Sequence, residues 1–312
     1  MLEVVNLSKE FKQKTVVKDV NMKIKQGETV GLMGPNGAGK STTISMIASL
    51  LEPSGGDILL NGKSTLKNPK PLRKMLGVVP QEIALYPELS GLENLHFFAR
   101  INKLKGAQLK KRVDEVLELI GLSDRKKDLV KTYSGGMKRR LNIGAALLHN
   151  PEFIIMDEPT VGIDPQSRNY ILEAVRKLNK EKNMSVLYTS HYMEEIEFLC
   201  DCVYIMDHGE IIASGTQDEV KGILSSENTV EVKLERHSDS FIEQIRQHEG
   251  ISSVSVKEND VTLTIIAPKG INIFTIIYPI SESLGIQFQS IEVKTPTLED
   301  VFLHLTGRKL RD

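Results

Sequence analysis

The sequence GPNGAGKST, residues Gly34 to Thr42, directly follows the short apolar run ETVGLM. It matches the phosphate-binding loop G-x-x-x-x-G-K-S/T, and from Lys40 to Leu51 the apolar residues recur at helical spacing. The glycines let backbone N–H groups turn inward around a phosphate, and the start of the following helix adds a positive end. The stretch therefore predicts a strand, a nucleotide phosphate loop and a helix. The residues of this predicted site are Gly34, Pro35, Asn36, Gly37, Ala38, Gly39, Lys40, Ser41 and Thr42.

Two side chains of the loop have distinct expected roles. Lys40 is placed to reach the β- and γ-phosphates of a nucleotide, and the Ser41 hydroxyl is placed to bind Mg²⁺. A chance glycine-rich turn is the alternative, and it would match the four fixed positions about once in a hundred chains of this length. The strand and the helix on either side favour the phosphate loop further.

A pair of carboxylates follows a second apolar strand, FIIM, residues Phe153 to Met156. In open α/β sheets, ligands bind at the carboxyl ends of the strands. We therefore expect Asp157 to lie on the Mg²⁺ side of the nucleotide and Glu158 to polarise an attacking water. Alone, the DEP sequence would be interpreted as a solvated turn. A phosphate loop upstream favours the catalytic interpretation.

A second anion site is predicted where Ser134, Gly135 and Gly136 open the helix MKRRLNIGAALLH. A hydroxyl and backbone N–H groups at a helix start can bind phosphate. Because one nucleotide already has its own loop, this second site is expected to face a nucleotide on another molecule. The basic run that follows, Lys138 to Arg140, predicts a solvated helix face.

Length and composition limit the class of protein. The 312 residues suggest two domains at about 150 residues each, and 40% apolar residues are enough for a sizeable core. A net charge of −1 argues against a protein that works mainly by charge on bare nucleic acid or lipid. The only cysteines, Cys200 and Cys202, form no disulfide framework and indicate a reducing compartment. We find neither a secretory signal at Met1 to Phe11 nor an apolar run of roughly 18 residues, so membrane work is expected to need a partner.

The order of predicted elements divides the chain. Residues 1–222 alternate strands with helices, which predicts an α/β fold with a mainly parallel sheet. A polar stretch at residues 222–229 is interpreted as a linker. Residues 229–312 then give the order β-α-β-β-α-β, the ferredoxin-like pattern, followed by a short helix that we expect to pack back on one of the domains.

The motifs together resemble those of the ATP-binding-cassette (ABC) ATPases, over residues 1–222. The family's signature LSGGQ corresponds to YSGGM here, with Tyr133 for Leu and Met137 for Gln. The resemblance implies ATP and Mg²⁺ as cofactors and a helical subdomain at about residues 82–150. It also assigns a role to four more residues: Gln81 as the Q-loop glutamine that binds Mg²⁺ and water, Asp164 in the D-loop, His191 as the switch histidine on the γ-phosphate, and Phe11 as the ring stacked on adenine.

Three longer segments are similar to a narrower group, the ATPases of ABC-2-type exporters. They are YSGGMKRRL, ALYPELSGLENLHFFARI and TPTLEDVFLHLTG. This similarity implies a head-to-tail dimer with a second ATP-binding subunit, either identical or a paralogue, and permease subunits in the membrane. It also implies a cytoplasmic location on the inner face of the cell membrane, with the apolar residues of Leu85 to Leu89 in the docking groove. No direct nucleic-acid partner is expected.

Two alternatives remain beside the exporter hypothesis. A soluble ABC ATPase acting on DNA or the ribosome is the first, although the segment between Lys40 and Ser134 is too short for a long coiled coil and the chain carries one cassette. The second is a module that binds ATP without turnover. Such a module would be expected to lack Glu158 or His191, and both residues are present.

Overall fold

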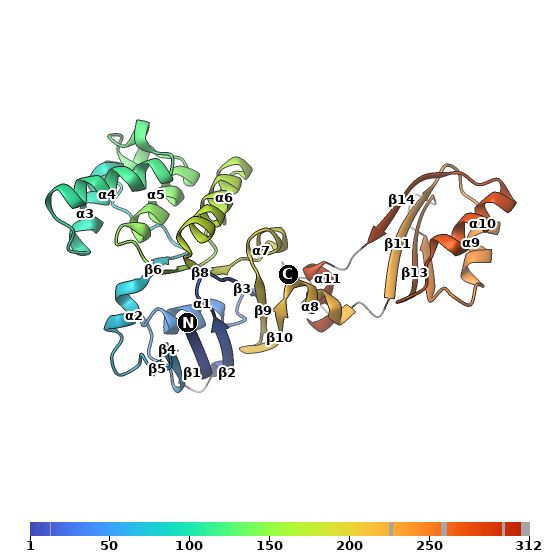
Figure 1. The fold of residues 1–312 in the computed structure, drawn as a ribbon, viewed down its shortest axis with the longest axis horizontal. Helices are drawn as coiled ribbons and strands as arrows, with labels where there is room; N and C mark the ends of the chain where they lie inside the picture. Colours follow the sequence, from blue (N-terminus) through green and yellow to red (C-terminus); the bar gives the residue numbers. More distant parts are fainter. Residues whose placement is uncertain (13, 225–226, 257–260, 295–296, 307–312) are drawn as a thin grey trace. The chain divides into compact units, whose positions relative to one another are not determined.

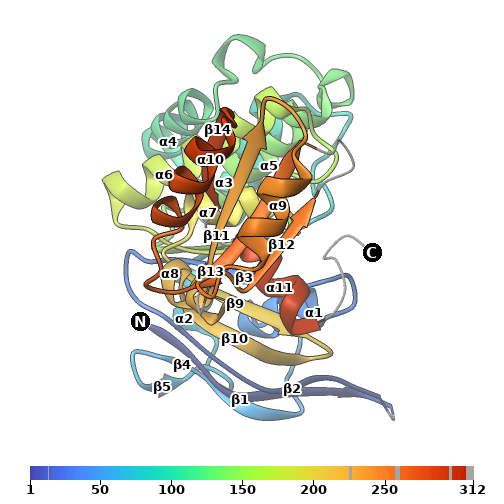
Figure 2. The ribbon, with the colours of Figure 1, turned by 90° about the vertical axis from the view of Figure 1, so that its right-hand side faces the viewer.

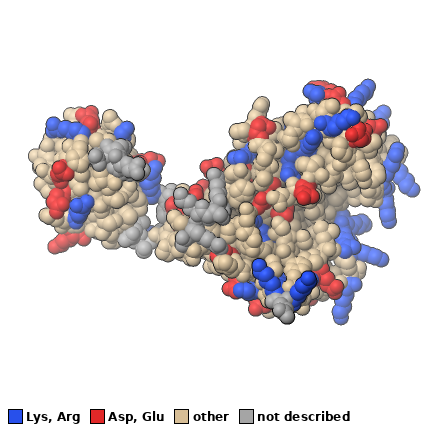
Figure 3. All heavy atoms as spheres, turned by 180° about the vertical axis from the view of Figure 1, so that it is seen from behind, with Lys and Arg blue, Asp and Glu red and all other residues tan. Residues whose placement is uncertain are grey.

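The computed structural model describes residues 1–312 except 13, 225–226, 257–260, 295–296 and 307–312, and it divides into two compact units. Unit 1 is Met1–Gln217 and unit 2 is Asp218–Gly307. The boundary falls just before the predicted linker at 222–229, of which Ser225 and Ser226 lie outside the described residues. Figure 3 shows acidic and basic side chains mixed on the visible face of each unit, with Lys and Arg gathered along one edge of unit 1.

A six-stranded sheet is the centre of unit 1, in the order β10-β9-β3-β8-β7-β6. All neighbours are parallel except β10, which pairs antiparallel with β9. The middle strands are buried on both faces, as expected of a parallel sheet. The strands are β3 (Thr29–Met33), β6 (Leu76–Val79), β7 (Phe153–Met156), β8 (Ser185–Thr189), β9 (Cys202–Asp207) and β10 (Glu210–Thr216).

A second, antiparallel sheet of unit 1 has the order β2-β1-β4-β5. A common core joins the two sheets to α1, with fully buried Leu7 from β1, Leu32 from β3 and Ile47 from α1. This core holds the helix of the phosphate loop between two layers. The strands are β1 (Leu2–Phe11), β2 (Lys14–Ile24), β4 (Gly55–Leu60) and β5 (Lys63–Ser64).

The helices of unit 1 include a group of their own, α3, α4 and α5, in the upper part of Figure 1. Two predicted N-termini are confirmed: Ser90 and Glu93 form a capping box on α3, and Asp164 caps α6 with Pro165 in the first turn. The helices are α1 (Lys40–Ile47), α2 (Lys70–Met75), α3 (Gly91–Ile101), α4 (Gly106–Leu119), α5 (Gly135–Leu147), α6 (Pro165–Lys182) and α7 (Met193–Leu199), with 3-10 turns η1 (Ser123–Arg125) and η2 (Val130–Thr132).

Unit 2 contains the predicted β-α-β-β-α-β order, in an antiparallel sheet β12-β13-β11-β14. Helices α9 and α10 cover one face of this sheet in Figures 1 and 2, and their apolar residues Phe241, Ile245 and Ile277 are fully buried in its core. The ferredoxin-like prediction is confirmed. The elements are β11 (Glu227–Leu234), α9 (Asp239–Arg246), β12 (Ser253–Val256), β13 (Thr262–Pro268), α10 (Phe274–Leu284) and β14 (Phe288–Lys294).

Three further helical segments are described outside this core: α8 (Gln217–Lys221), which begins at the last residue of unit 1, η3 (Gly222–Leu224) and α11 (Leu298–Thr306). The last is the predicted terminal helix, and it packs against η3. Its residues Leu298, Val301 and Phe302 are fully buried. The helix is therefore anchored at the start of unit 2, apart from the core that lies under α9 and α10.

Candidate nucleotide site

The phosphate loop joins the central strand β3 to α1, as predicted. Gly39 forms the N-cap of α1 with a φ of 107°, and no described side chain caps this helix start. The first backbone N–H groups of α1 are thus available to an anion. A side chain would not fit at Gly34, because its Cβ would lie 2.2 Å from the carbonyl oxygen of Met206. The close packing of the loop on β9 therefore requires this glycine.

Lys40 is a buried cation at the start of α1, with 5% of the residue exposed. Its Nζ donates hydrogen bonds to the carbonyl oxygens of Gly34 at 2.8 Å and Pro35 at 3.2 Å. The same atom lies 3.5 Å from Oε1 of Glu158. Burial lowers the pKa of Lys40, while the nearby Glu158 and Asp157 carboxylates act in the opposite direction. The loop backbone thus holds the Lys40 amine beside the predicted catalytic carboxylate.

Glu158 follows β7 in a left-handed backbone conformation, with a φ of 44°. This conformation is unfavourable for a residue with a side chain and is common at functional sites. A neighbouring strand stabilises it: the Glu158 N–H donates to Thr189 Oγ1 at 2.8 Å, and the Thr189 hydroxyl donates to Asp157 Oδ1 at 2.9 Å. Sequence reasoning missed Thr189, whose only signal was its place at the end of a buried strand before His191.

Gln81 and His191 converge on the Glu158 carboxylate from the ends of two other strands. Gln81 Nε2 donates to Glu158 Oε2 at 3.4 Å, and His191 Nδ1 lies 3.5 Å from the same oxygen. The structure thus brings the predicted catalytic residues together beside the loop. A pocket of about 280 Å³ is lined by Val16, Asn36, Gly37, Gly39, Lys40, Ser41, Thr42, Gln81 and Glu158.

The second predicted anion site lies at the start of α5 and does not line this pocket. Ser134 is the N-cap, and its Oγ accepts a hydrogen bond from the Met137 N–H at 3.2 Å, which leaves the hydroxyl proton available to a ligand. Gly136 packs so closely on α6 that a Cβ there would lie 2.0 Å from Ser167 Oγ. Asp164, the N-cap of α6, accepts the Ser167 N–H at 2.9 Å, and hydrogen bonds from Ser167 lower the pKa of the Asp164 carboxyl.

Phe11 ends β1 as an exposed ring, with 45% of the residue accessible and the Lys9 amine 5.2 Å from the ring centroid. It does not line the pocket at the phosphate loop, whereas Val16, on the neighbouring strand β2, does. Sequence reasoning did not single out Val16. The predicted stacking of Phe11 on adenine stays a prediction.

The prediction of a solvated basic face on α5 is wrong at Arg139. This residue is 4% exposed, and its guanidinium donates to the carbonyl oxygens of Pro80 at 2.8 Å and Gln81 at 2.6 Å. The physical reason is helical spacing. Arg139 lies three residues after Gly136 and four before Ile143, so it shares the helix face on which these two residues are buried. Arg139 therefore fixes the backbone of the segment that carries the Gln81 side chain.

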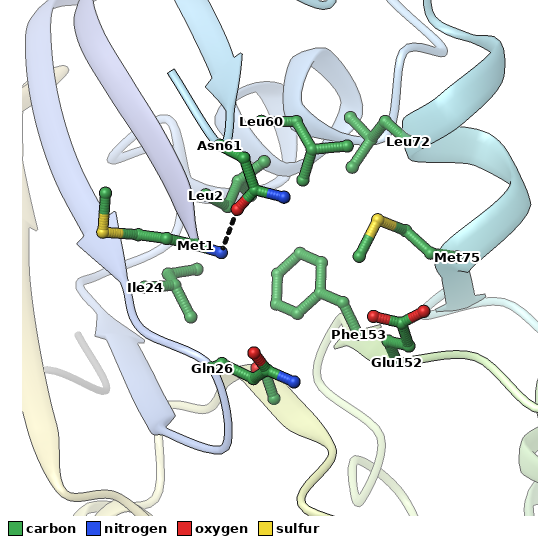
Figure 4. Close-up of a pocket in the computed structure, with 11 residues that line it drawn as sticks. Met1, Leu2, Ile24, Gln26, Leu60, Asn61, Leu72, Met75, Glu152 and Phe153 are labelled. Carbon is green, nitrogen blue, oxygen red and sulfur yellow. Dashed lines mark hydrogen bonds between the residues drawn. The ribbon is translucent and has the colours of Figure 1, made fainter. Parts of the chain in front are cut away.

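A second cavity, in the close-up of Figure 4, is a poor nucleotide site. It measures about 60 Å³ and is lined mainly by apolar side chains such as Leu2, Ile24 and Phe153. Within it, the terminal amine of Met1 donates to Asn61 Oδ1 at 2.9 Å. The pocket at the phosphate loop is larger and is lined by Lys40, Glu158 and the glycines of the loop, so it remains the candidate site.

A divalent ion in this site would need ligands of several chemical types. Among the described residues, no group of three or more His, Cys, Asp or Glu side chains could hold a metal ion on its own. The Ser41 hydroxyl, the Gln81 amide oxygen and the Asp157 carboxylate are oxygen donors, which Mg²⁺ prefers, and Mg²⁺ commonly completes its shell with substrate phosphates. The donor set therefore fits a magnesium ion that arrives with a nucleotide.

A phosphate loop after β3 and a carboxylate pair after β7, which lies two strands away in the same sheet, define a P-loop nucleotide-binding protein. The sequence profile described as "ABC transporter" matches residues 17–161. The chain is 47% identical, over the full length of both proteins, to "Linearmycin resistance ATP-binding protein LnrL" of Bacillus subtilis. It is 35% identical to "Nod factor export ATP-binding protein I" of Cupriavidus metallidurans, over 100% of this chain and 99% of that one.

A solved dimer of the ATP-binding cassette MJ0796 with ADP and Pi is 28% identical, with a TM-score of 0.64, and the match covers 69% of this chain and 98% of that one. The chain belongs to the family of ABC transporter ATP-binding proteins. It is an ATP-binding and ATP-hydrolysing cassette, and the predicted fold and enzyme class are confirmed. In the described part of the chain, no helix is long and apolar enough to cross a membrane.

Proposed function

We propose that this chain powers a membrane exporter by pairing with a second ATP-binding subunit when both bind ATP. The observation that carries the proposal is the convergence of Lys40, Gln81 and His191 on Glu158 beside the phosphate loop. Two similar proteins support the exporter assignment, since one is described as a resistance protein and the other as an export protein.

Within one cassette, each polar group of the site has a separate task. Lys40 and the N–H groups of α1 bind the β- and γ-phosphates, and Ser41, Gln81 and Asp157 hold Mg²⁺, which neutralises phosphate charge when bound. Glu158 accepts the proton of the attacking water, and His191 contacts the γ-phosphate. Phe11 offers its exposed ring to the adenine.

The second subunit is needed because the signature residues do not line the pocket of their own chain. Ser134, Gly135 and Gly136 at the start of α5, together with Asp164, would contact the ATP held by Lys40 of the partner cassette. The exposed helix start and the remaining Ser134 proton suit a phosphate that arrives from outside. An identical chain and a paralogue both satisfy this geometry.

A docking surface for the permease is supported by exposed apolar side chains on the helical subdomain. Ile83, Tyr86 and Phe97 are 38%, 47% and 37% exposed, and the rings of Tyr86 and Phe97 meet edge to face at 4.8 Å. Apolar residues that stay exposed side by side mark interaction surfaces. A permease bound there would place this chain on the inner face of the cell membrane.

Purification from cells with intact membranes tests the proposal. The chain should co-purify with a multi-span membrane protein. A triple variant, with Ile83, Tyr86 and Phe97 each replaced by serine, should no longer bind this membrane protein while its ATP binding stays unchanged. Recovery of nucleic acid or ribosomes in place of a membrane protein would contradict the exporter assignment.

A further inference from the structure

Glu195 is a buried carboxylate for which the proposed mechanism has no role. It lies on α7 and is 1% exposed. Its Oε2 atom accepts hydrogen bonds from the hydroxyls of Thr160 at 2.8 Å, Tyr188 at 2.9 Å and Ser190 at 2.8 Å. Its Oε1 atom lies 3.4 Å from Nε of Arg168, an ion pair without hydrogen-bond geometry.

The surroundings of Glu195 fit a carboxylate and not an amide of the same shape. The three hydroxyls all donate to Oε2, and Arg168 has donors but no acceptor, so a glutamine that keeps its amide oxygen on the hydroxyls would turn its NH₂ group toward the Arg168 guanidinium. Burial, reinforced by the Glu195 charge, raises the pKa of the Tyr188 hydroxyl. A buried charge is costly unless it is paired and hydrogen-bonded, and here three hydroxyl donors and the Arg168 cation offset that cost.

The hydrogen-bond partners of Glu195 come from two segments, one that follows Glu158 and one that precedes His191. Thr160 lies two residues after Glu158, on the segment that leads to the D-loop residue Asp164. Ser190 directly precedes His191, and its Oγ also accepts the Tyr192 N–H at 2.9 Å. One carboxylate oxygen thus joins the segment that follows the proposed base to the segment that carries the switch histidine.

Arg168 extends this connection through stacked side chains. It lies on α6, and its guanidinium carbon is 4.3 Å from the ring centroid of Tyr192. The Tyr192 ring in turn lies 4.3 Å from the His191 ring. The Arg168 side chain therefore contacts both Glu195 and the residue that packs beside the switch histidine.

We propose that Glu195 is a positioning residue for ATP hydrolysis, which holds the Thr160 and Ser190 segments in one arrangement and so fixes His191 relative to Glu158. The inference rests on the roles proposed above for Glu158 and His191. Small displacements of groups that act on a reacting centre reduce rates strongly even when binding is intact. Loss of Glu195 should therefore lower the catalytic rate more than the affinity for ATP.

The first test replaces the carboxylate by an amide in the full chain. Glu195→Gln should lower kcat roughly ten- to a hundredfold, while the dissociation constant for ATP changes less than about twofold. Glu194→Gln is the matched control, because its side chain is exposed and adjacent. A kcat within about twofold of wild type, or a parallel loss of ATP affinity and of thermal stability, would overturn the positioning role.

The second test leaves the buried charge in place. Thr160→Val and Ser190→Ala each break one connection to Glu195, and the double variant should lose little more activity than the worse single variant. The reason is that either break already frees the two segments from each other. Effects on kcat that simply multiply would show two independent local losses and would contradict the inference.

Glu158→Gln, measured beside these variants, separates the inference from the proposed function. If Glu158→Gln hydrolyses ATP at the wild-type rate, the assignment of the base is wrong, and the inference about Glu195 falls with it. If Glu158→Gln is inactive and Glu195→Gln retains wild-type kcat, the proposed function stands and only the role of Glu195 is wrong.

Discussion

Lys40 Nζ lies 3.5 Å from Glu158 Oε1, and both side chains are buried beside the phosphate loop. The residue proposed to bind phosphate is thus paired with the residue proposed to activate water. Phosphates of ATP carry more negative charge than one carboxylate and compete with Glu158 for Lys40. Nucleotide binding is therefore expected to free the Glu158 carboxylate for the water.

Lys40→Ala should weaken ATP binding by more than about tenfold, because it removes a charged hydrogen-bond donor to the phosphates and leaves Glu158 buried without its cation. Binding of a fluorescent ATP analogue measures the effect. Undiminished ATP hydrolysis by this variant would contradict the assignment of the phosphate loop.

Ser134→Arg tests whether the signature residues act across a dimer. The variant should bind ATP as a monomer with nearly unchanged affinity, because Ser134 does not line the pocket of its own chain. Its turnover should fall, since the bulky cation blocks closure of two cassettes.

Mixing Ser134→Arg with Lys40→Ala sharpens this test. In a mixed dimer, one composite site carries both changes and the other carries neither, so phosphate release should partly return at equal total protein, provided that one intact site suffices. Loss of ATP binding by the Ser134→Arg monomer would overturn the assignment across the dimer. If subunit exchange is shown and activity does not return, either the two sites are strictly coupled or that assignment fails.

Arg139→Met should destabilise the cassette by about 2–4 kcal/mol and lower turnover, because it removes two charged hydrogen bonds to the backbone at Pro80 and Gln81. Urea unfolding measures the loss of stability. Lys138→Met, on the half-buried neighbour, is the control and should change stability by less than about 0.5 kcal/mol. Equal stability of the two variants would show that the Arg139 contacts contribute little.

The thiol of Cys202 should react slowly with iodoacetamide at pH 8. Burial and a hydrogen bond to Glu28 Oε1 at 3.3 Å raise the pKa of Cys202 to about 11. The alkylation rate should therefore keep rising up to about pH 11, and Glu28→Gln should shift the rise to lower pH. A rate that levels off near the ordinary thiol pKa of 9.0 would contradict this.

The stability of the protein should follow the same titration. Between about pH 9 and 11 the folded state holds the Cys202 proton that the unfolded chain has lost, so this group's contribution to stability falls as pH rises through that window. Thermal unfolding across the window, with Cys202→Ala for comparison, measures the effect.

Local signals carried most of the sequence predictions that the structure confirms. The capping box of Ser90 and Glu93 and the Asp164-Pro165 helix start are each encoded within four residues. The phosphate loop is likewise continuous in sequence. The order of strands and helices in unit 2 could be predicted because apolar residues recur at strand or helix spacing within each element, and polar residues bound it.

Contacts between distant segments could not be predicted in the same way. Thr189 meets Glu158 only because β7 and β8 are neighbours in the sheet, and Arg139 meets Gln81 only because α5 packs on the segment after β6. Glu195 lies in a run of acidic residues, a pattern that is typical of a solvated helix face, but in the folded protein its side chain is buried. A side chain's burial depends on tertiary packing, which residue type and local spacing do not contain.

Glu158→Gln tests whether Glu158 is the base for hydrolysis and whether ATP pairs two cassettes. Glutamine keeps the shape of Glu158 and can hydrogen-bond water, but it does not accept the proton at physiological pH. We expect the variant to bind ATP, to release no phosphate, and to accumulate as a dimer in ATP by size-exclusion chromatography with light scattering. A variant that stays monomeric in ATP and hydrolyses it at the wild-type rate would contradict both the base role of Glu158 and the ATP-driven pairing of two cassettes.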